Sequence, residues 1–226
     1  PSLHLPVVAV VLLGLLLTQR RVLRDKPARV SASDPVLALP RGALWPLALI
    51  ATASMLAEGA VADWSAVSLR ESLGSSPGIA ALALSAFSLG LTATRFAADR
   101  LGERFGDLVL LRVGALIAAL GMASGIVSQT APVAILGFLA VGVGFAAVVP
   151  IAFRRAANTQ GITPGVGVAA VATLAYTGFL AGPPVIGLIA EGVGLGTAMA
   201  IIPFLALVVV AISLTVARDR PVDGHD

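Results

Sequence analysis

The chain has no cysteine, one lysine and two histidines, and these scarcities exclude several classes of function. Without cysteine there is no disulfide framework, thiolate metal cluster or thiol nucleophile. His4 and His225 stand near the two ends of the chain, so neither a Ser–His proteolytic pair nor a metal site built from histidine and carboxylates is indicated. Retinal proteins bind their chromophore through a lysine within a membrane span. The single lysine, Lys26, lies in a polar stretch instead, which excludes a retinal protein. We expect no enzyme activity and no cofactor.

Charged residues are also scarce. They make up 12% of the sequence against 58% hydrophobic residues, far from the composition of a soluble globular domain. About twenty apolar residues in a helix cover a hydrocarbon core of roughly 30 Å, so the apolar runs predict an all-α polytopic membrane protein. The seven predicted spans are Leu3–Thr18, Ala43–Ala66, Ser76–Thr94, Leu108–Ser128, Ala131–Phe153, Val166–Ala190 and Gly194–Ala217.

The positive charges segregate to one side of these spans. If the chain crosses the membrane at each span, fourteen of the fifteen Lys and Arg residues fall on one side, and only Arg70 falls on the other. The positive-inside rule then predicts an inner-membrane protein with this side, and the C-terminus, in the cytoplasm. Because the Arg residues lie near span ends, the basic isoelectric point indicates contact with anionic lipid and not with nucleic acid.

The predicted spans form an arrangement of one helix, a linker and a bundle. Residues 20–42 are polar and contain three prolines, which predicts a flexible cytoplasmic linker. The linker joins one helix, in residues 1–19, to a six-helix bundle in residues 43–217, and residues 218–226 form a cytoplasmic tail. Since the first residue is Pro1 and no signal peptide precedes the first span, we expect the chain to be the tail of a longer protein.

The span Ala43–Ala66 carries the most informative residue, Glu58. Trp45 and Trp64 lie about 28 Å apart on a helix, which predicts two interfacial anchors, and Glu58 would lie roughly 9 Å inside the outer one. A lone charge in hydrocarbon is costly, so Glu58 must face protein or water, carry a proton or find a partner. Two interpretations remain open: a proton-coupling or substrate-contacting carboxylate, and a structural hydrogen bond to a neighbouring helix.

A second carboxylate, Asp63, follows Glu58 by five residues. The two side chains point about 140° apart around the helix, so they do not form a simple acid pair. Asp63 is predicted to be either an outer gate or part of a solvent-exposed rim.

The connection between Thr94 and Leu108 contains a recognisable pattern, in which Asp99 and Arg100 are followed by Gly102 and Arg104. A carboxylate at one helix end would meet cations and the N-terminus of the next helix there. The pattern resembles the Asp-Arg-x-Gly-x-Arg signature of the major facilitator superfamily, which occurs between helices two and three and, more weakly, between helices eight and nine. The resemblance covers essentially the whole chain as helices 7 to 12 preceded by helix 6.

The resemblance implies a role for the matching residues. In the family the signature helps to lock the cytoplasmic side, so Asp99, Arg100, Gly102 and Arg104 are expected to form a cytoplasmic gate. Arg95 replaces the glycine usually found four residues before the Asp, so close helix packing is less expected at this turn. The alternative is that the charges of this connection only fix the orientation of the protein in the membrane, as the positive-inside rule describes.

The sixth span contains adjacent prolines in a glycine-rich segment. Gly182, Pro183 and Pro184 predict a bent or broken helix, because proline removes backbone donors. The segment resembles helix eleven of bacterial facilitators, and Tyr176 and Phe179 are candidate cavity walls, with packing or lipid contact as the alternative. Small residues spaced by four, such as Gly178 and Gly182, also predict close helix approach.

Together with the resemblance, these features favour a secondary active transporter. We expect alternating access, in which two six-helix bundles rock about a central site for a small solute, with protons as candidate co-substrates. The partner would be the missing N-terminal bundle of the same protein. The alternatives are a uniporter or drug efflux pump of the same fold, or a non-transporting helical membrane subunit.

Overall fold

A computed structural model describes residues 10, 13–14 and 37–216. The chain divides into two compact units, Pro1–Asp34 and Pro35–Asp226. The predicted first span, most of the linker and the C-terminal tail lie outside the described residues.

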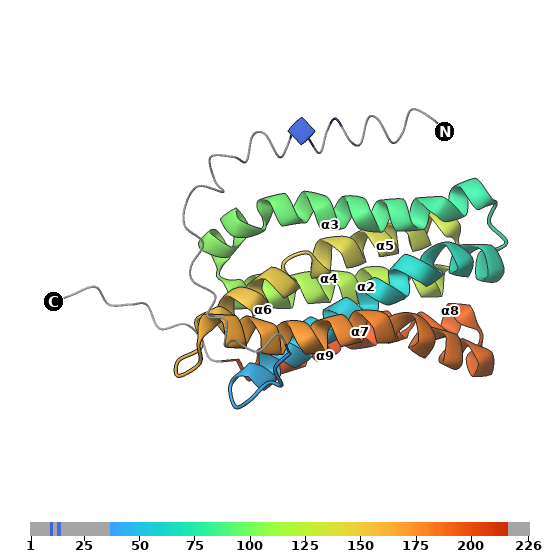
Figure 1. The fold of residues 1–226 in the computed structure, drawn as a ribbon. Coiled ribbons are helices and arrows are strands. Elements are labelled where there is room, and N and C mark those ends of the chain that lie inside the picture. Colours follow the sequence, from blue (N-terminus) through green and yellow to red (C-terminus); the bar gives the residue numbers. More distant parts are fainter. Residues whose placement is uncertain (1–9, 11–12, 15–36, 217–226) are drawn as a thin grey trace. The chain divides into compact units, whose positions relative to one another are not determined.

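The described part of the second unit is helical, which confirms the predicted fold class. Six stretches of the described residues are long and apolar enough to cross a membrane, as predicted for the bundle; one of them joins α5 to α6 and another α8 to α9. The helices, labelled as in Figure 1, are α2 (Leu44–Leu73), α3 (Pro77–Phe105), α4 (Asp107–Ser128), α5 (Ala131–Phe145), α6 (Val148–Ala157), α7 (Pro164–Val193), α8 (Leu195–Ala198) and α9 (Ile201–Ser213).

Two helices run further than the apolar spans predicted. The helix α2 continues past Ala66 to Leu73, and α3 continues past Thr94 to Phe105. The predicted connection before Leu108 is therefore mostly helix, and only Gly106, with a φ of 86°, separates α3 from α4. Hydropathy falls where polar residues begin, but Arg, Ala, Leu and Glu favour a helix in water as much as in lipid. The predicted loop was wrong for this reason.

The span predicted as Ala131–Phe153 is not one regular helix. It is interrupted at Ala146 and Ala147, between the end of α5 and the start of α6. Both alanines are buried within the bundle. The interruption lies near the centre of the membrane-spanning stretch Ala131–Ala157.

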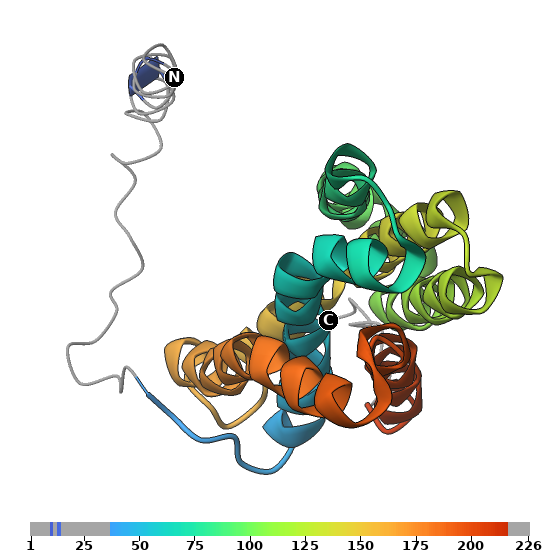
Figure 2. The same ribbon diagram turned by 90° about the vertical axis from the view of Figure 1, so that its right-hand side faces the viewer.

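Glycines set how closely α3 and α4 pack on α5. A Cβ atom at Gly142 of α5 would overlap the carbonyl oxygen of Phe87 on α3, and one at Gly144 would overlap that of Gly114 on α4. Neighbouring backbones thus touch without side chains between them. In the end-on view of Figure 2, α3 and α4 lie on either side of α5.

The helices α2 and α7 are distant in sequence but pack along most of their lengths. A Cβ atom at Gly178 would lie 2.7 Å from the carbonyl oxygen of Thr52, and one at Gly182 would overlap that of Leu56. This confirms the close approach predicted from Gly178 and Gly182. Gly178 meets Thr52 and Gly182 meets Leu56, so residue numbers rise together along the two helices. The helices α2 and α7 therefore run in the same direction.

Candidate functional site

Glu58 lies halfway along α2 and is partly buried. The sequence placed it nearer the outer end, because Trp64 was taken to mark the membrane surface. Since α2 continues to Leu73, nine residues beyond Trp64, Glu58 is deeper than predicted. It occupies the middle of the membrane-spanning part, where secondary transporters bind their solutes and coupling ions.

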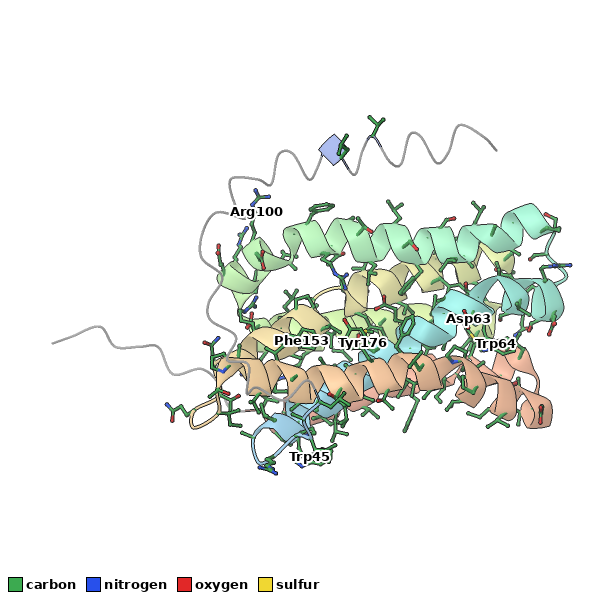
Figure 3. All side chains as sticks on the ribbon, viewed as in Figure 1. Trp45, Asp63, Trp64, Arg100, Phe153 and Tyr176 are labelled. Atoms are coloured by element: carbon green, nitrogen blue, oxygen red, sulfur yellow. The ribbon has the colours of Figure 1, made fainter. Side chains whose placement is uncertain are left out.

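Trp64 does not serve as a free interfacial anchor. Its indole is partly buried, and Nε1 donates a hydrogen bond of 2.9 Å to the backbone carbonyl oxygen of Pro183 on α7. Figure 3 shows Trp64 inward from the end of α2, whereas the exposed Trp45 lies near the start of that helix. Trp64 therefore joins α2 to α7 six residues beyond Glu58, about 9 Å away along the helix.

The predicted break at Gly182, Pro183 and Pro184 does not form, because α7 is one continuous helix from Pro164 to Val193. Pro183 and Pro184 have no backbone N–H group, so the carbonyls of residues 179 and 180 lack their usual helical hydrogen-bond donors. The carbonyl of Phe179 lies so close to Gly59 that a Cβ atom on Gly59 would overlap it. Close packing against α2 shields this carbonyl and holds the segment helical.

The structure brings only part of the predicted site together. Phe179 is half-buried at the level of Gly59, next to Glu58, and Tyr176 lies one turn away along α7 with its side chain exposed. Asp63 is exposed on α2, beyond Glu58 (Figure 3). The roles of Tyr176 and Phe179 as cavity walls and of Asp63 as an outer gate stay predictions.

Arg95 adds a charge that the sequence did not assign to this site. Its Nε donates to the carbonyl oxygen of Ala146 at 3.5 Å, inside the interruption between α5 and α6. The positive charge of Arg95 also acts on the carboxylate of Glu58 across from α3. Arg95 on α3 thus bonds an irregular backbone carbonyl and also contributes to the electrostatic surroundings of Glu58 on α2. From the sequence, Arg95 was expected among the basic residues of the cytoplasmic side, where it replaces a glycine of the family signature.

A cluster of charges lies at the end of the bundle where α3 meets α4 and α6 ends. We call this end, which holds Asp99, Arg104, Asp107 and Arg154, the basic end. Arg154 Nη2 lies 2.7 Å from Asp107 Oδ1, while Arg154 Nη1 lies 3.8 Å from Asp99 Oδ1. Arg155 Nε lies 3.9 Å from Asp107 Oδ2. Asp107 is therefore the centre of the cluster.

The signature residues contribute unequally to this cluster. The side chain of Asp107 is 16% exposed and that of Asp99 is 88% exposed. A Cβ atom on Gly102 would lie 3.2 Å from Asp107 Oδ1, so a small residue there leaves room for the ion pair. Arg100 is exposed, and Arg104 lies over the ring of Phe105 at 5.3 Å. The sequence signal for Asp107 was its position as the first residue of α4, where the helix dipole favours an acid.

We expect the two aspartates of this cluster to differ in their contribution to stability. Asp107→Asn removes one charge of a short, shielded ion pair and should lower the free energy of unfolding by about 1 to 2 kcal/mol. Asp99→Asn should change it little, because exposed ion pairs contribute little. Thermal unfolding of the full-length protein in detergent measures both. Equal shifts for the two variants would contradict the central position of Asp107.

Comparison with known proteins gives relatives for the bundle but no match to any protein-family model. The chain is 37% identical over 177 residues to an uncharacterized transporter of Sinorhizobium fredii, covering 78% of this chain and 47% of the relative. It is 35% identical to an uncharacterized MFS-type transporter of Yersinia pestis, covering 81% and 48%, and 34% identical to the membrane protein MosC of Rhizobium meliloti, covering 74% and 41%. The chain thus spans about half the length of these relatives.

A solved structure shares the fold. The fucose:proton symporter FucP of E. coli superposes with a TM-score of 0.68 at 20% identity, covering 79% of this chain and 44% of that one. At this identity the likeness concerns the fold. Taken with the relatives, it shows that the chain belongs to the major facilitator superfamily, of whose transporters it represents a C-terminal half.

Proposed function

We propose that the complete protein is a secondary transporter that moves a small solute by alternating access and couples this movement to protons at Glu58. The observation that carries the proposal is the position of Glu58, a partly buried acid halfway along α2. A carboxylate at this depth has a function more often than not, because its charge is costly in lipid. The fold shared with a fucose:proton symporter supports the same mechanism.

The proposal also assigns the N-terminal residues, the C-terminus and the two predicted gates. Residues 1–19 would be the last helix of the N-terminal bundle, and residues 20–42 the cytoplasmic linker to the bundle described here. The protein would lie in the inner membrane with its C-terminus in the cytoplasm, since twelve of the fourteen Arg residues, not counting Arg70 and Arg95, fall on this side of the predicted spans. The cluster of charges at the basic end would close the cytoplasmic side, and Asp63 would lie at the outer mouth.

Uptake by the full-length protein in proteoliposomes tests the proposal. With the interior more alkaline than the medium, a panel of neutral sugars and other small polar solutes is offered in radiolabelled form. We expect at least one solute to accumulate above its external concentration, and a protonophore should abolish the excess. Uptake that only equilibrates, with or without the pH gradient, would identify a uniporter. Failure of every solute to enter, by protein that is folded and correctly inserted, would favour a non-transporting subunit.

A further inference from the structure

A long apolar groove runs between α3 and α4 over the recessed helix α5. Both outer helices pack tightly on α5 through glycines, yet they make little contact with one another. The space between them is a groove of about 530 Å³, floored by Val143 of α5. Its walls are almost entirely apolar and include Ala97, Leu101 and Phe105 of α3 and Val113 and Ile117 of α4.

The length of the groove matches half of a bilayer. Its α3 wall extends from Ala93 to Phe105, or about 18 Å at helical rise. Half of a hydrocarbon core is about 15 Å thick. The groove ends at the basic end of the bundle, so it spans one leaflet from that surface to near the midplane. Its length and apolar lining fit an acyl chain.

Two arginines lie on α3 beside the last two turns of the groove, next to its lining residues Leu101 and Phe105. Arg100 and Arg104 follow Ala93 by seven and eleven residues, so each lies within about 20° of Ala93 around the helix axis. Arg104 covers the ring of Phe105, which itself lines the groove. Arg100 projects outward from the end of α3 (Figure 3). Of the nearby acids, Asp99 and Glu103 lie about 120° and 80° from Ala93 around the helix axis, and Asp107 is bound by Arg154.

We propose that this groove is a binding site for one anionic phospholipid, whose acyl chain lies between α3 and α4 and whose phosphate is bound by Arg100 and Arg104. Charge complementarity selects the occupant: the phosphate of a zwitterionic lipid such as phosphatidylcholine is offset by its own trimethylammonium group, whereas an anionic lipid brings a net negative charge to the two guanidinium groups. Basic pockets between membrane helices bind lipid headgroups in this way. The site is separate from Glu58 and does not depend on the proposed transport activity.

Native mass spectrometry of the full-length protein tests the headgroup contact. With dioleoyl lipids at equal concentration, we expect phosphatidylglycerol to bind about tenfold more than phosphatidylcholine. The double variant Arg100→Gln, Arg104→Gln should bind both lipids equally. Arg70→Gln is the matched control, since it removes an exposed arginine at the opposite end and should keep the preference. Equal binding of the two lipids by the wild type, or an unchanged preference in the double variant, would overturn the proposal.

Photo-crosslinking from the groove identifies its occupant in native membranes. A benzoyl-phenylalanine placed at Val113, which is half-exposed in the groove, should give adducts whose added mass is that of a phospholipid. An adduct with a second copy of the chain, or with another part of the same protein, would show that protein covers the groove. Either of those results would refute the lipid site, even if the arginines bind anionic lipid at the surface. Dihexanoyl phosphatidylglycerol should bind several-fold more weakly than the dioleoyl form; equal binding would exclude a role for the groove.

Discussion

Glu58→Gln in the full-length protein is expected to abolish accumulation of solute against its gradient under an imposed pH difference. Glutamine keeps the size and hydrogen-bonding capacity of the side chain but neither gains nor loses a proton. Exchange of labelled for unlabelled solute at equal pH should remain within about threefold of the wild type, because exchange needs no net proton movement. Both rates are measured in proteoliposomes with the solute identified by the uptake panel.

Two control variants distinguish a role of Glu58 in proton coupling from a purely structural role. Asp63→Asn alters the exposed carboxylate on the same helix and should leave accumulation in place. Arg95→Gln removes the charge that acts on Glu58 and should shift the pH at which accumulation is half-maximal. Retained accumulation in Glu58→Gln would refute the coupling role and favour a structural hydrogen bond. Loss of exchange together with accumulation would instead make Glu58 a solute contact.

The second large effect is expected from Gly142→Val. A Cβ atom at this position would overlap the carbonyl oxygen of Phe87 and lie 2.8 Å from the backbone nitrogen of Leu91. Both obstacles are backbone atoms of α3, so no rotamer change relieves the overlap. We expect a loss of about 3 kcal/mol or more in stability, since overpacking of this kind forces helices apart. The yield of monodisperse protein and its unfolding temperature measure the effect.

Gly78→Val is the matched control for this substitution. Gly78 lies near the start of α3, and nothing lies within 4 Å of a Cβ atom built there. The same added side chain should therefore leave yield and unfolding temperature near those of the wild type. If Gly142→Val were as stable as Gly78→Val, the tight contact of α3 with α5 would not exist in the folded protein.

The membrane-spanning helices were predictable because hydrophobic length is a local property of the sequence. The short link of Gln129 and Thr130 between α4 and α5 was located for the same reason. The helix ends were not, because α3 continues past its apolar stretch through Asp99 and Arg104 to Phe105. Hydropathy detects apolar residues, whereas charged residues such as Arg and Glu also favour a helix.

The site was only partly predictable, because its contacts join residues far apart in sequence. Glu58 stood out as a charge inside an apolar run, but its relation to Arg95 depends on how α2 and α3 pack. Trp64 has the spacing of an interfacial anchor, and only the tertiary structure shows that its indole binds the carbonyl of Pro183. The prolines of α7 would break an isolated helix, whereas packing against Gly59 keeps this one continuous.

The interruption at Ala146 and Ala147 makes α6 a lever arm. Its near end adjoins the carbonyl bound by Arg95, and Arg154 lies seven residues beyond Ala147, about 10 Å away at helical rise. A tilt of about 10° at the pivot would move the backbone at Arg154 by about 1.8 Å, given that arm length. Added to the 2.7 Å that separates Arg154 from Asp107, this displacement is enough to break the ion pair. A small rearrangement near Arg95 would thus open a charge pair at the bundle's surface.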